Sequence, residues 1–243
     1  MLKITRIELE LLSDENIHNF ILSGIRGGIV QCCKRHSIAN NKYLSDYNVT
    51  KLSHYLIYLG VNNLYGYAMS QYTPHNNFEC IKNVKEFNVF SIPEDSLVGY
   101  ILEVDLDYPI AIHNTHNDFP FCFENKKVGS MKHIKLIGDL TSKIKYIIHY
   151  KNLQQCIKHG LILRKIYRIL KFNQSYWLKK YTDLNNYHRT IAANKFEENF
   201  FKLLNNAVYG KTMENVDKRI NVKLEQDWEN TNIGGRRRRG RKK

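Results

Sequence analysis

The sequence has little of what secreted, membrane-spanning or zinc-stabilised proteins need. Among 243 residues only four are proline and five are cysteine. The cysteines form no CxxC pair and no cluster with ligand spacing, which argues for a reducing compartment and against a structural zinc site. The N-terminal MLKITRIELELL carries charges where a signal peptide needs an apolar run. No run of about 18 uncharged apolar residues occurs, so we expect an intracellular protein without a membrane partner.

Acidic residues are outnumbered by basic ones, which makes the chain strongly cationic. Lys and Arg number 37 against 23 Asp and Glu, and the formal net charge is +14. Seven of the positive charges lie in the last eight residues, Arg236–Lys243, and without them the balance is still 30 against 23. A polyanionic partner is therefore the first expectation, although solubility alone would also explain a basic composition.

Apolar periodicity predicts strands first and long helices later. A helix is expected over Leu12–Gly28. Strands are expected over His54–Val61, Val98–Pro109, Ile134–Leu140 and Lys143–Tyr150. Further helices are expected over Leu153–Leu161 and Asn185–Lys211, with an ambiguous apolar run, Ile166–Phe172, between them. This order predicts an α+β fold rather than alternating strands and helices.

The last predicted helix carries two different faces. One is an apolar stripe at helical spacing: Phe196, Phe200, Leu203, Leu204, Ala207 and Val208. The other holds Lys195, Lys202, Asn206 and Tyr209. A cation, an amide and an aromatic ring on one face suit a phosphate, a base edge and a ring plane. A solvated helix face is the structural alternative, and periodicity alone favours it.

Three stretches of the chain, GIRGG (Gly24–Gly28), IYLGVNNLYGYAMSQ (Ile57–Gln71) and KLLNNAVYG (Lys202–Gly210), resemble in this order motifs of family B DNA polymerases. IYLGVNNLYGYAMSQ (Ile57–Gln71) is similar to motif A in its NLYG form, and KLLNNAVYG (Lys202–Gly210) is similar to motif B, K-x-x-x-N-[SA]-x-Y-G. GIRGG (Gly24–Gly28) resembles the glycine motif that joins the exonuclease and polymerase parts of protein-primed members, with Ile25 where a Tyr often stands. The connecting sequence resembles polymerases of Polinton (Maverick) transposons and related viruses. The resemblance covers roughly residues 10–230.

The resemblance implies template-directed nucleotidyl transfer. In this chemistry two divalent metal ions, normally Mg²⁺, clamp the attacking and leaving oxygens while cations hold the triphosphate. Tyr65 corresponds to the family tyrosine that packs under the incoming sugar. Lys202 corresponds to the lysine that reaches the triphosphate, and Asn206 and Tyr209 to residues lining the nascent base pair. The implied partners are template-primer DNA, deoxynucleoside triphosphates and a terminal protein primer, at a nuclear, viral or organellar replication site.

These correspondences give the predicted site residues. The predicted catalytic residues are Tyr65 and Lys202. The predicted nucleotide-binding residues are Tyr65, Arg189, Lys202, Asn206 and Tyr209. The predicted DNA-binding residues are Arg26, Gly27, Gly28, Gly210 and Lys211, and we expect Arg26, Arg189, Lys202 and Lys211 to share one groove. We also expect Tyr65 to lie close to the motif B face, although more than a hundred residues separate them.

The sequence departs from the family pattern at the metal-binding carboxylates and at two positions that are often basic. Gly60 stands where the motif A Asp is expected, and the residues that follow it, Val61 to Asn63, add no carboxylate. Thr190 and Glu198 stand near positions where intact relatives often carry Lys. No D-[TS]-D triplet, the motif C signature, occurs in the sequence. We therefore predict no metal-binding residues and a catalytically incompetent polymerase fragment.

Two other interpretations stay open. The first is a non-enzymatic nucleic-acid-binding remnant or co-opted transposon protein, which keeps a basic groove without the chemistry. The second is a nucleotide-sugar enzyme, because Asp105 and Asp107 lie two apart on a predicted strand and their carboxylates share one face. A solvent-facing strand edge explains that pair more simply. His113 and His116 resemble a ligand pair but have no convincing third partner.

The predicted organisation follows the resemblance. Residues 1–50 are the exonuclease–palm connector, 51–180 the palm with motif A and an inserted region, and 181–216 the fingers helix with motif B. Residues 217–243 are a truncated palm remnant and the basic tail. That tail has three interpretations: a nucleic-acid or nuclear-localisation segment, sequence translated beyond a frameshift or exon error, or a solvated charge run. The abrupt loss of resemblance favours the second.

Overall fold

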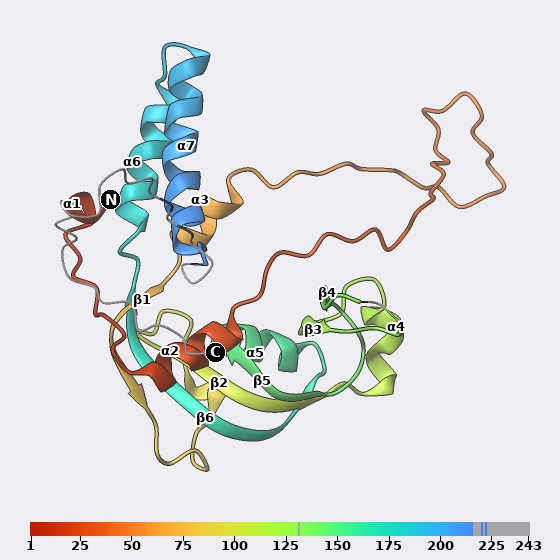
Figure 1. The fold of residues 1–243 in the computed structure, drawn as a ribbon. Coiled ribbons are helices and arrows are strands. Elements are labelled where there is room, and N and C mark those ends of the chain that lie inside the picture. The colour runs from red at the N-terminus through yellow and green to blue at the C-terminus, as the bar shows by residue number, and fades with distance from the viewer. Residues whose placement is uncertain (131, 216–219, 221, 223–243) are drawn as a thin grey trace.

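The structure of the chain, a computed structural model, describes residues 1–130, 132–215, 220 and 222 (Figure 1). Arg236–Lys243 and the rest of the predicted 217–243 segment, apart from Ile220 and Val222, lie outside the described residues. The α-helices are α1 (Leu2–Thr5), α2 (Glu15–Gly24), α3 (Leu64–Met69), α4 (His113–His116), α5 (Tyr150–Lys158), α6 (Lys179–Thr190) and α7 (Lys195–Thr212). The strands are β1 (Thr73–Cys80), β2 (Val98–Asp107), β3 (Glu124–Lys126), β4 (Lys135–Ile137), β5 (Lys143–His149) and β6 (Ile162–Ser175). Short 3₁₀ turns occupy Val89–Ser91 and Ile110–Ile112.

Four strands form a curled antiparallel sheet in the order β1-β6-β2-β5 (Figure 1). Alternation along the strands gives each face its own apolar set. On one face Leu102 and Leu106 of β2 are completely buried with Leu153 of α5. On the other face Phe20 of α2 packs with Leu170 of β6. The sheet thus has α5 on one side and α2 on the other, and the predicted α+β fold is confirmed.

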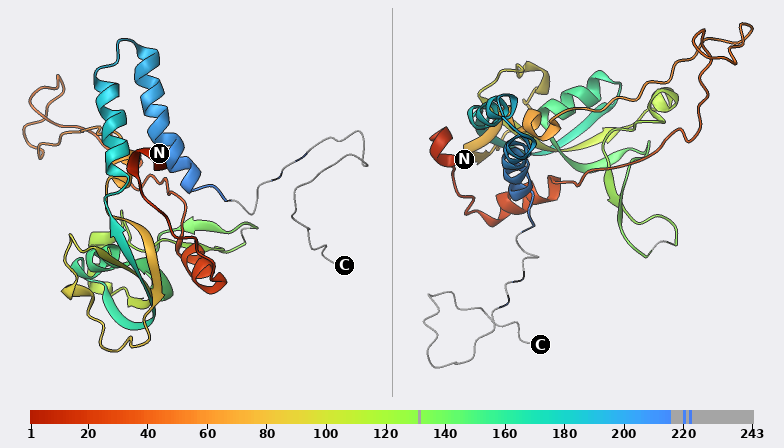
Figure 2. Two further views of the ribbon diagram at one scale, coloured as in Figure 1. Left: turned by 90° about the vertical axis from the view of Figure 1, so that its left-hand side faces the viewer. Right: turned by 90° about the horizontal axis from the view of Figure 1, so that it is seen from above.

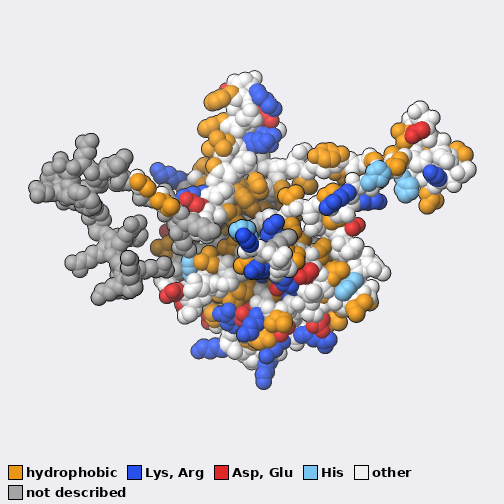
Figure 3. Space-filling model, turned by 45° about the vertical axis from the view of Figure 1, so that its right-hand side comes forward, with side chains coloured by type: hydrophobic (Ala, Val, Ile, Leu, Met, Phe, Trp, Pro, Cys, Tyr) orange, Lys and Arg blue, Asp and Glu red, His pale blue; other side chains and the backbone are white. Residues whose placement is uncertain are grey.

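The helical part projects from one end of the sheet. The views of Figures 1 and 2 agree that α6 and α7 run side by side away from the strands, with α3 at their base. Figure 3 shows hydrophobic side chains along one edge of this projecting pair, and Phe196, Phe200 and Leu203 of the predicted apolar stripe are indeed exposed. The stripe is therefore largely not a core face. Among the described residues, no helix combines the length and apolarity needed to cross a bilayer.

The single helix predicted over Asn185–Lys211 is wrong, because the chain turns back between α6 and α7. Asn194 caps the second helix by accepting a hydrogen bond from the Glu197 backbone N–H at 2.9 Å. The Glu197 carboxylate in turn accepts the Ala193 N–H at 3.0 Å. This reciprocal cap satisfies backbone donors that a new helix start exposes. The signal, N-x-x-E, was present in the sequence inside the predicted helix.

The buried strand predicted over His54–Val61 is also wrong. After a single bridge between Asn40 and His54, the chain runs as irregular structure to α3. Tyr58 is completely exposed and Leu59 is 84% exposed. A strand needs a neighbour for its backbone groups, and here the segment leaves the body of the protein without joining either edge of the sheet (Figure 1). The apolar composition of this segment alone therefore led to the wrong prediction of a buried strand.

The structure also differs from the predicted boundaries of several other helices and strands. The first predicted helix starts later, at Glu15, because Asp14 caps it by accepting N–H groups of Asn16 and Ile17, and it ends at Gly24. The ambiguous Ile166–Phe172 run lies within β6. The strand predicted over Ile134–Leu140 is reduced to three residues. Strand β1 was not predicted, since its polar, proline-containing sequence TPHNNFEC lacks an apolar alternation.

Candidate functional site

The candidate site forms where α3 meets the helical pair. Helix α3 starts after Asn63, whose φ of 55° places it in the left-handed region. Asn tolerates this conformation better than most residues because its short polar side chain bonds locally. Gly66 follows one turn later, and a Cβ built there would come within 2.3 Å of the Asn63 side-chain amide. Because Gly66 has no side chain, the Asn63 amide can lie against helix α3.

A ladder of asparagine amides joins the three helices. The Asn63 Nδ2 donates to Asn186 Oδ1 at 3.2 Å, which ties α3 to α6. Asn205 of α7 donates to the same Asn186 oxygen at 3.2 Å and accepts from Asn185 Nδ2 at 2.8 Å. Asn185 and Asn205 are each only 3% exposed. Buried amides that satisfy one another in this way fix a relative placement of elements that apolar packing alone leaves loose.

We expect Asn205→Ala to lower the free energy of unfolding by about 1–3 kcal/mol, because it leaves the buried Asn185 amide without its acceptor. Urea denaturation followed by circular dichroism measures the loss. Asn206→Ala is the matched control on the same helix, where the side chain faces a cavity, and it should cost less than about 0.5 kcal/mol. Equal losses for the two variants would contradict the role of the ladder.

Two tyrosines meet beside this ladder. The rings of Tyr65 on α3 and Tyr209 on α7 stack with centroids 4.2 Å apart and an interplanar angle of 16°. Next to them lies a cavity of about 570 Å³ lined by Val61, Asn62, Asn63, Leu64, Tyr65, Arg189, Lys202 and Asn206. The expected approach of Tyr65 to the motif B face is therefore found.

The cavity is cationic. Arg189 from α6 and Lys202 from α7 both line it, and none of the carboxylates that the structure describes does. Arg189 Nη2 pairs with Glu198 at 3.2 Å, and Lys195 pairs with the same carboxyl group at 2.7 Å. Hydrogen bonds from Lys195 and Arg189 hold the pKa of Glu198 below its usual range. Among the residues that the structure describes, no acidic group pairs with Lys202, which leaves its ammonium available to an anion.

Sequence reasoning missed the asparagine ladder. A signal existed, because three of the five Asn-Asn pairs in the chain, Asn62-Asn63, Asn185-Asn186 and Asn205-Asn206, belong to this site. The fold brings these three pairs together, and three of their six side chains, Asn62, Asn63 and Asn206, line the cavity. An Asn-Asn pair alone does not predict a contact between helices, since Asn-Asn is also a common turn sequence.

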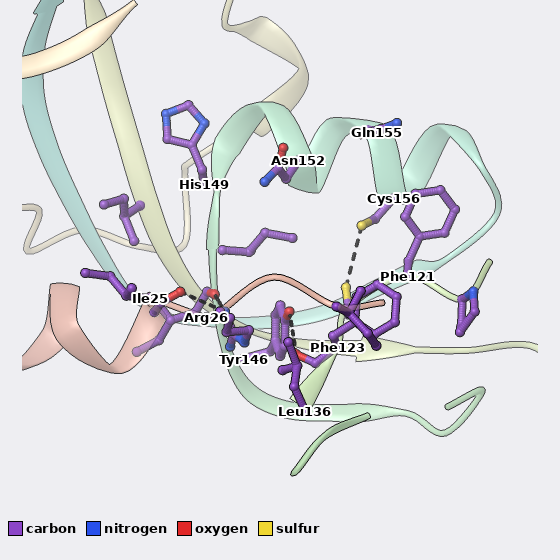
Figure 4. A pocket seen from close by; sticks show the side chains of 18 of the residues that line it. Ile25, Arg26, Phe121, Phe123, Leu136, Tyr146, His149, Asn152, Gln155 and Cys156 are labelled. Atoms are coloured by element: carbon purple, nitrogen blue, oxygen red, sulfur yellow. Dashed lines mark hydrogen bonds between the residues drawn. The ribbon is translucent and has the colours of Figure 1, made fainter. Parts of the chain in front are cut away.

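None of the five residues predicted to bind DNA lines the cavity that Arg189 and Lys202 share. Arg26 lines a separate cavity, where its guanidinium lies 3.8 Å from the centre of the Tyr146 ring and donates to the Gly24 and Ile147 carbonyls at 3.0 and 2.9 Å (Figure 4). Gly27 and Gly28 follow it, and Gly210 lies on α7. Lys211 pairs with Glu214 at the end of α7. Arg26 therefore lines a different cavity from Arg189 and Lys202, and a role of Arg26 and Lys211 in DNA binding stays a prediction.

The described residues do not fit the metal ions that the resemblance implies. Gly60 lies in the exposed segment, where a Cβ would have nothing within 4 Å, and no carboxylate among the described side chains lines the neighbouring cavity. Within residues 1–130 and 132–215, no group of three or more His, Cys, Asp or Glu side chains is placed to hold a metal.

The aspartates of the alternative metal site have protein partners. Asp105 accepts the Lys145 N–H and the Tyr167 hydroxyl, both at 2.7 Å, and these bonds lower the pKa of Asp105 against the opposing effect of burial. Asp107 pairs with Arg164.

The two histidines that resembled a ligand pair both bond to Tyr108. The His116 ring lies 2.8 Å from the Tyr108 hydroxyl, and the His113 ring lies 3.1 Å from the Tyr108 carbonyl.

No family model matches this sequence, and no curated protein matches it. Among solved structures the chain is similar to Phi29 DNA polymerase in its orthorhombic crystal form, with a TM-score of 0.53 and 17% identity over 88% of this chain and 34% of that one. It is also similar to Phi29 DNA polymerase complexed with primer-template DNA and incoming nucleotide substrates, with a TM-score of 0.52 and 16% identity over 86% of this chain and 33% of that one. The chain thus spans about a third of the length of the structures it matches. Its fold is that of a DNA polymerase fragment.

Proposed function

We propose that this chain is a polymerase-like fragment that binds a deoxynucleoside triphosphate between α3, α6 and α7, beside DNA, and does not incorporate it unaided. The observation that carries the proposal is the convergence at one cavity of Arg189, Lys202 and Asn206 with the stacked pair Tyr65 and Tyr209. The likeness in fold to Phi29 DNA polymerase, one of whose structures is a complex with primer-template DNA and incoming nucleotide substrates, supports the same partners here.

The cations suit the triphosphate. Guanidinium and ammonium groups form charge-assisted hydrogen bonds with phosphate oxygens, about twice as strong as neutral ones. Lys202 contributes an ammonium group without an acidic partner among the described residues, while Arg189 is shared with Glu198. Lys202 is therefore the principal phosphate ligand, and Arg189 the secondary one.

The aromatic and amide groups suit the nucleoside. Each tyrosine ring offers an apolar face to a sugar or base, and Asn206 offers both a donor and an acceptor to a base edge. Tyr65 is 48% exposed, so part of its ring is open to a ligand despite the stack with Tyr209. Asn185, Asn186 and Asn205 act through these residues by holding the helices in register.

The finer assignment to protein-primed family B, with Polinton polymerases as the nearest group and a terminal protein as primer, rests on the sequence motifs. We infer catalytic incompetence because Gly60 stands at the expected aspartate position and no carboxylate of the described residues lines the cavity, whereas two-metal chemistry needs carboxylates to hold the ions. What remains is a binding site without its metal centre.

We expect Lys202→Ala to weaken dATP binding about tenfold, because a charge-assisted hydrogen bond at a partly exposed site contributes about 1.5 kcal/mol. Isothermal titration of the full chain with dATP measures the affinity. The matched control is Lys179→Ala, which removes an exposed α6 lysine paired with Asp183 and should leave the affinity unchanged. Equal affinities for the wild type and Lys202→Ala would remove the central residue from the proposal.

The second candidate is a nucleic-acid-binding remnant without a nucleotide site, favoured by the positive balance of residues 1–235. It predicts salt-dependent DNA binding and no dATP binding. Binding of both ligands by the same folded chain supports the polymerase-like site, whereas DNA binding alone supports the remnant.

A further inference from the structure

A second cavity, of about 960 Å³, holds two cysteines in its wall (Figure 4). It is bounded by the end of α2, by β5 and by α5, and both Cys122 and Cys156 line it. Their Sγ atoms lie 3.6 Å apart, although the residues are 34 apart in the chain. The dashed line from Cys156 in Figure 4 marks this contact between the sulfurs. Both thiols are buried, yet both border a space that a small molecule would fill.

The fold fixes the approach of these two sulfurs. Cys156 lies on α5 within the main apolar core, and Cys122 belongs to the same cluster. The chain on either side of Cys122 is anchored, because the Phe121 N–H donates to the Tyr108 hydroxyl at 3.3 Å and the Tyr146 hydroxyl donates to the Phe123 carbonyl at 3.1 Å. The contact therefore does not depend on the position of a free loop.

The two thiols differ in acidity. The hydrogen bond from Cys122 lowers the pKa of Cys156, whereas the same bond and burial raise the pKa of Cys122. Because the thiolate is the nucleophile in thiol–disulfide exchange, Cys156 reacts first. The other three cysteines, Cys32, Cys33 and Cys80, are exposed, and the structure places no pair of them across such a cavity.

We propose that Cys122 and Cys156 form a reversible disulfide by exchange with a small-molecule disulfide that enters this cavity. The Cys156 thiolate attacks one sulfur of the small disulfide, which forms a mixed disulfide and releases one small thiol. The Cys122 sulfur then attacks Cys156 and releases the second small thiol. The protein pair loses two electrons and two protons, and the small disulfide gains both. The new bond ties the segment before β3 to α5 across the cavity wall.

The test uses the full chain with Cys32, Cys33 and Cys80 replaced by serine, so that the buried pair is the sole source of thiols. The folded protein is incubated with hydroxyethyl disulfide, then denatured and alkylated with iodoacetamide. We expect a loss of two hydrogen masses, no alkylation, and one crosslinked peptide containing Cys122 and Cys156. The midpoint of thermal unfolding should rise by roughly 5–10 °C and return after reduction with dithiothreitol.

Two controls keep the result specific. Adding Cys122→Ser to the same background should give a mixed disulfide at Cys156, with neither crosslink nor thermal shift. Peptide mapping of the oxidised wild-type chain should show the same crosslink. The proposal is overturned if both thiols of the treated protein are still alkylated after denaturation, or if mapping of the wild-type chain joins Cys122 to Cys33, whose sulfur lies 2.6 Å from the Asp118 carbonyl oxygen.

Discussion

Purified chain should extend no primer above background with either magnesium or manganese. Nucleotidyl transfer needs carboxylates that hold both ions and stabilise the charge of the transition state, and this electrostatic stabilisation is usually the largest single contribution to the rate. Here Gly60 stands at the position of the expected aspartate, and no carboxylate from the described part of the chain lines the cavity between α3, α6 and α7. A primer-extension assay with radiolabelled primer measures incorporation, and clear extension by the purified chain would contradict the account.

The variant Gly60→Asp sharpens this expectation. A Cβ at this position meets nothing within 4 Å, so the substitution should be accommodated. One carboxylate does not make a two-metal site, and among the described residues no cluster supplies the others. Gly60→Asp should therefore remain inactive while retaining wild-type dATP affinity. Activity gained by this single change would show that a second carboxylate is already present.

DNA binding should fall by about 10³-fold or more between about 50 and 200 mM salt if six or more phosphates are contacted, since each contact releases counterions. Deleting Arg236–Lys243 removes seven positive charges and should both weaken binding and flatten the salt dependence. Fluorescence anisotropy with a labelled duplex of arbitrary sequence measures both. Two unrelated duplexes should bind equally, because phosphate contacts carry no sequence information.

Some binding should survive that deletion. Residues 1–235 still carry seven more basic than acidic residues, and Arg189 and Lys202 line one cationic cavity. In the tail-less chain, Lys202→Ala with Lys211→Ala should reduce what remains, whereas Lys179→Ala should not. Complete loss of binding on deleting the tail alone would leave the α3–α6–α7 surface without a role in DNA binding.

The sequence predicted the structure correctly where residue types with a known chemistry occur at the spacing of a motif. Motif order was enough to predict that Tyr65 and Lys202 would meet, and the α+β fold followed from the strand and helix order. Prediction from the sequence failed where the local structure depends on contacts with other segments of the chain. The apolar His54–Val61 run resembles a buried strand, yet it joins neither edge of the sheet and is exposed. The break between α6 and α7 was hidden because a cap of the N-x-x-E type competes with an otherwise continuous helical pattern.

The asparagine ladder is a second feature that could not be predicted from the sequence. Asn63, Asn186 and Asn205 are far apart in the sequence, and each alone is ordinary at a turn or on a helix. Their role becomes visible only in the fold, where the Asn63 and Asn205 amides both donate to Asn186 Oδ1 at 3.2 Å. Similarly, Arg26 had the charge of a DNA ligand, but its place against Tyr146 and two backbone carbonyls could not be inferred from a GIRGG pattern.

Photo-crosslinking with an azido-substituted dATP, followed by peptide mapping, tests the central claim most directly. If the nucleotide occupies the cavity between α3, α6 and α7, the label should appear in residues 61–65 or 202–209, and unlabelled dATP should compete it away. Lys202→Ala should reduce labelling in parallel with affinity. Competable labelling confined to the sheet, at β2 near Asp105 and Asp107, would contradict the account and favour the alternative site instead.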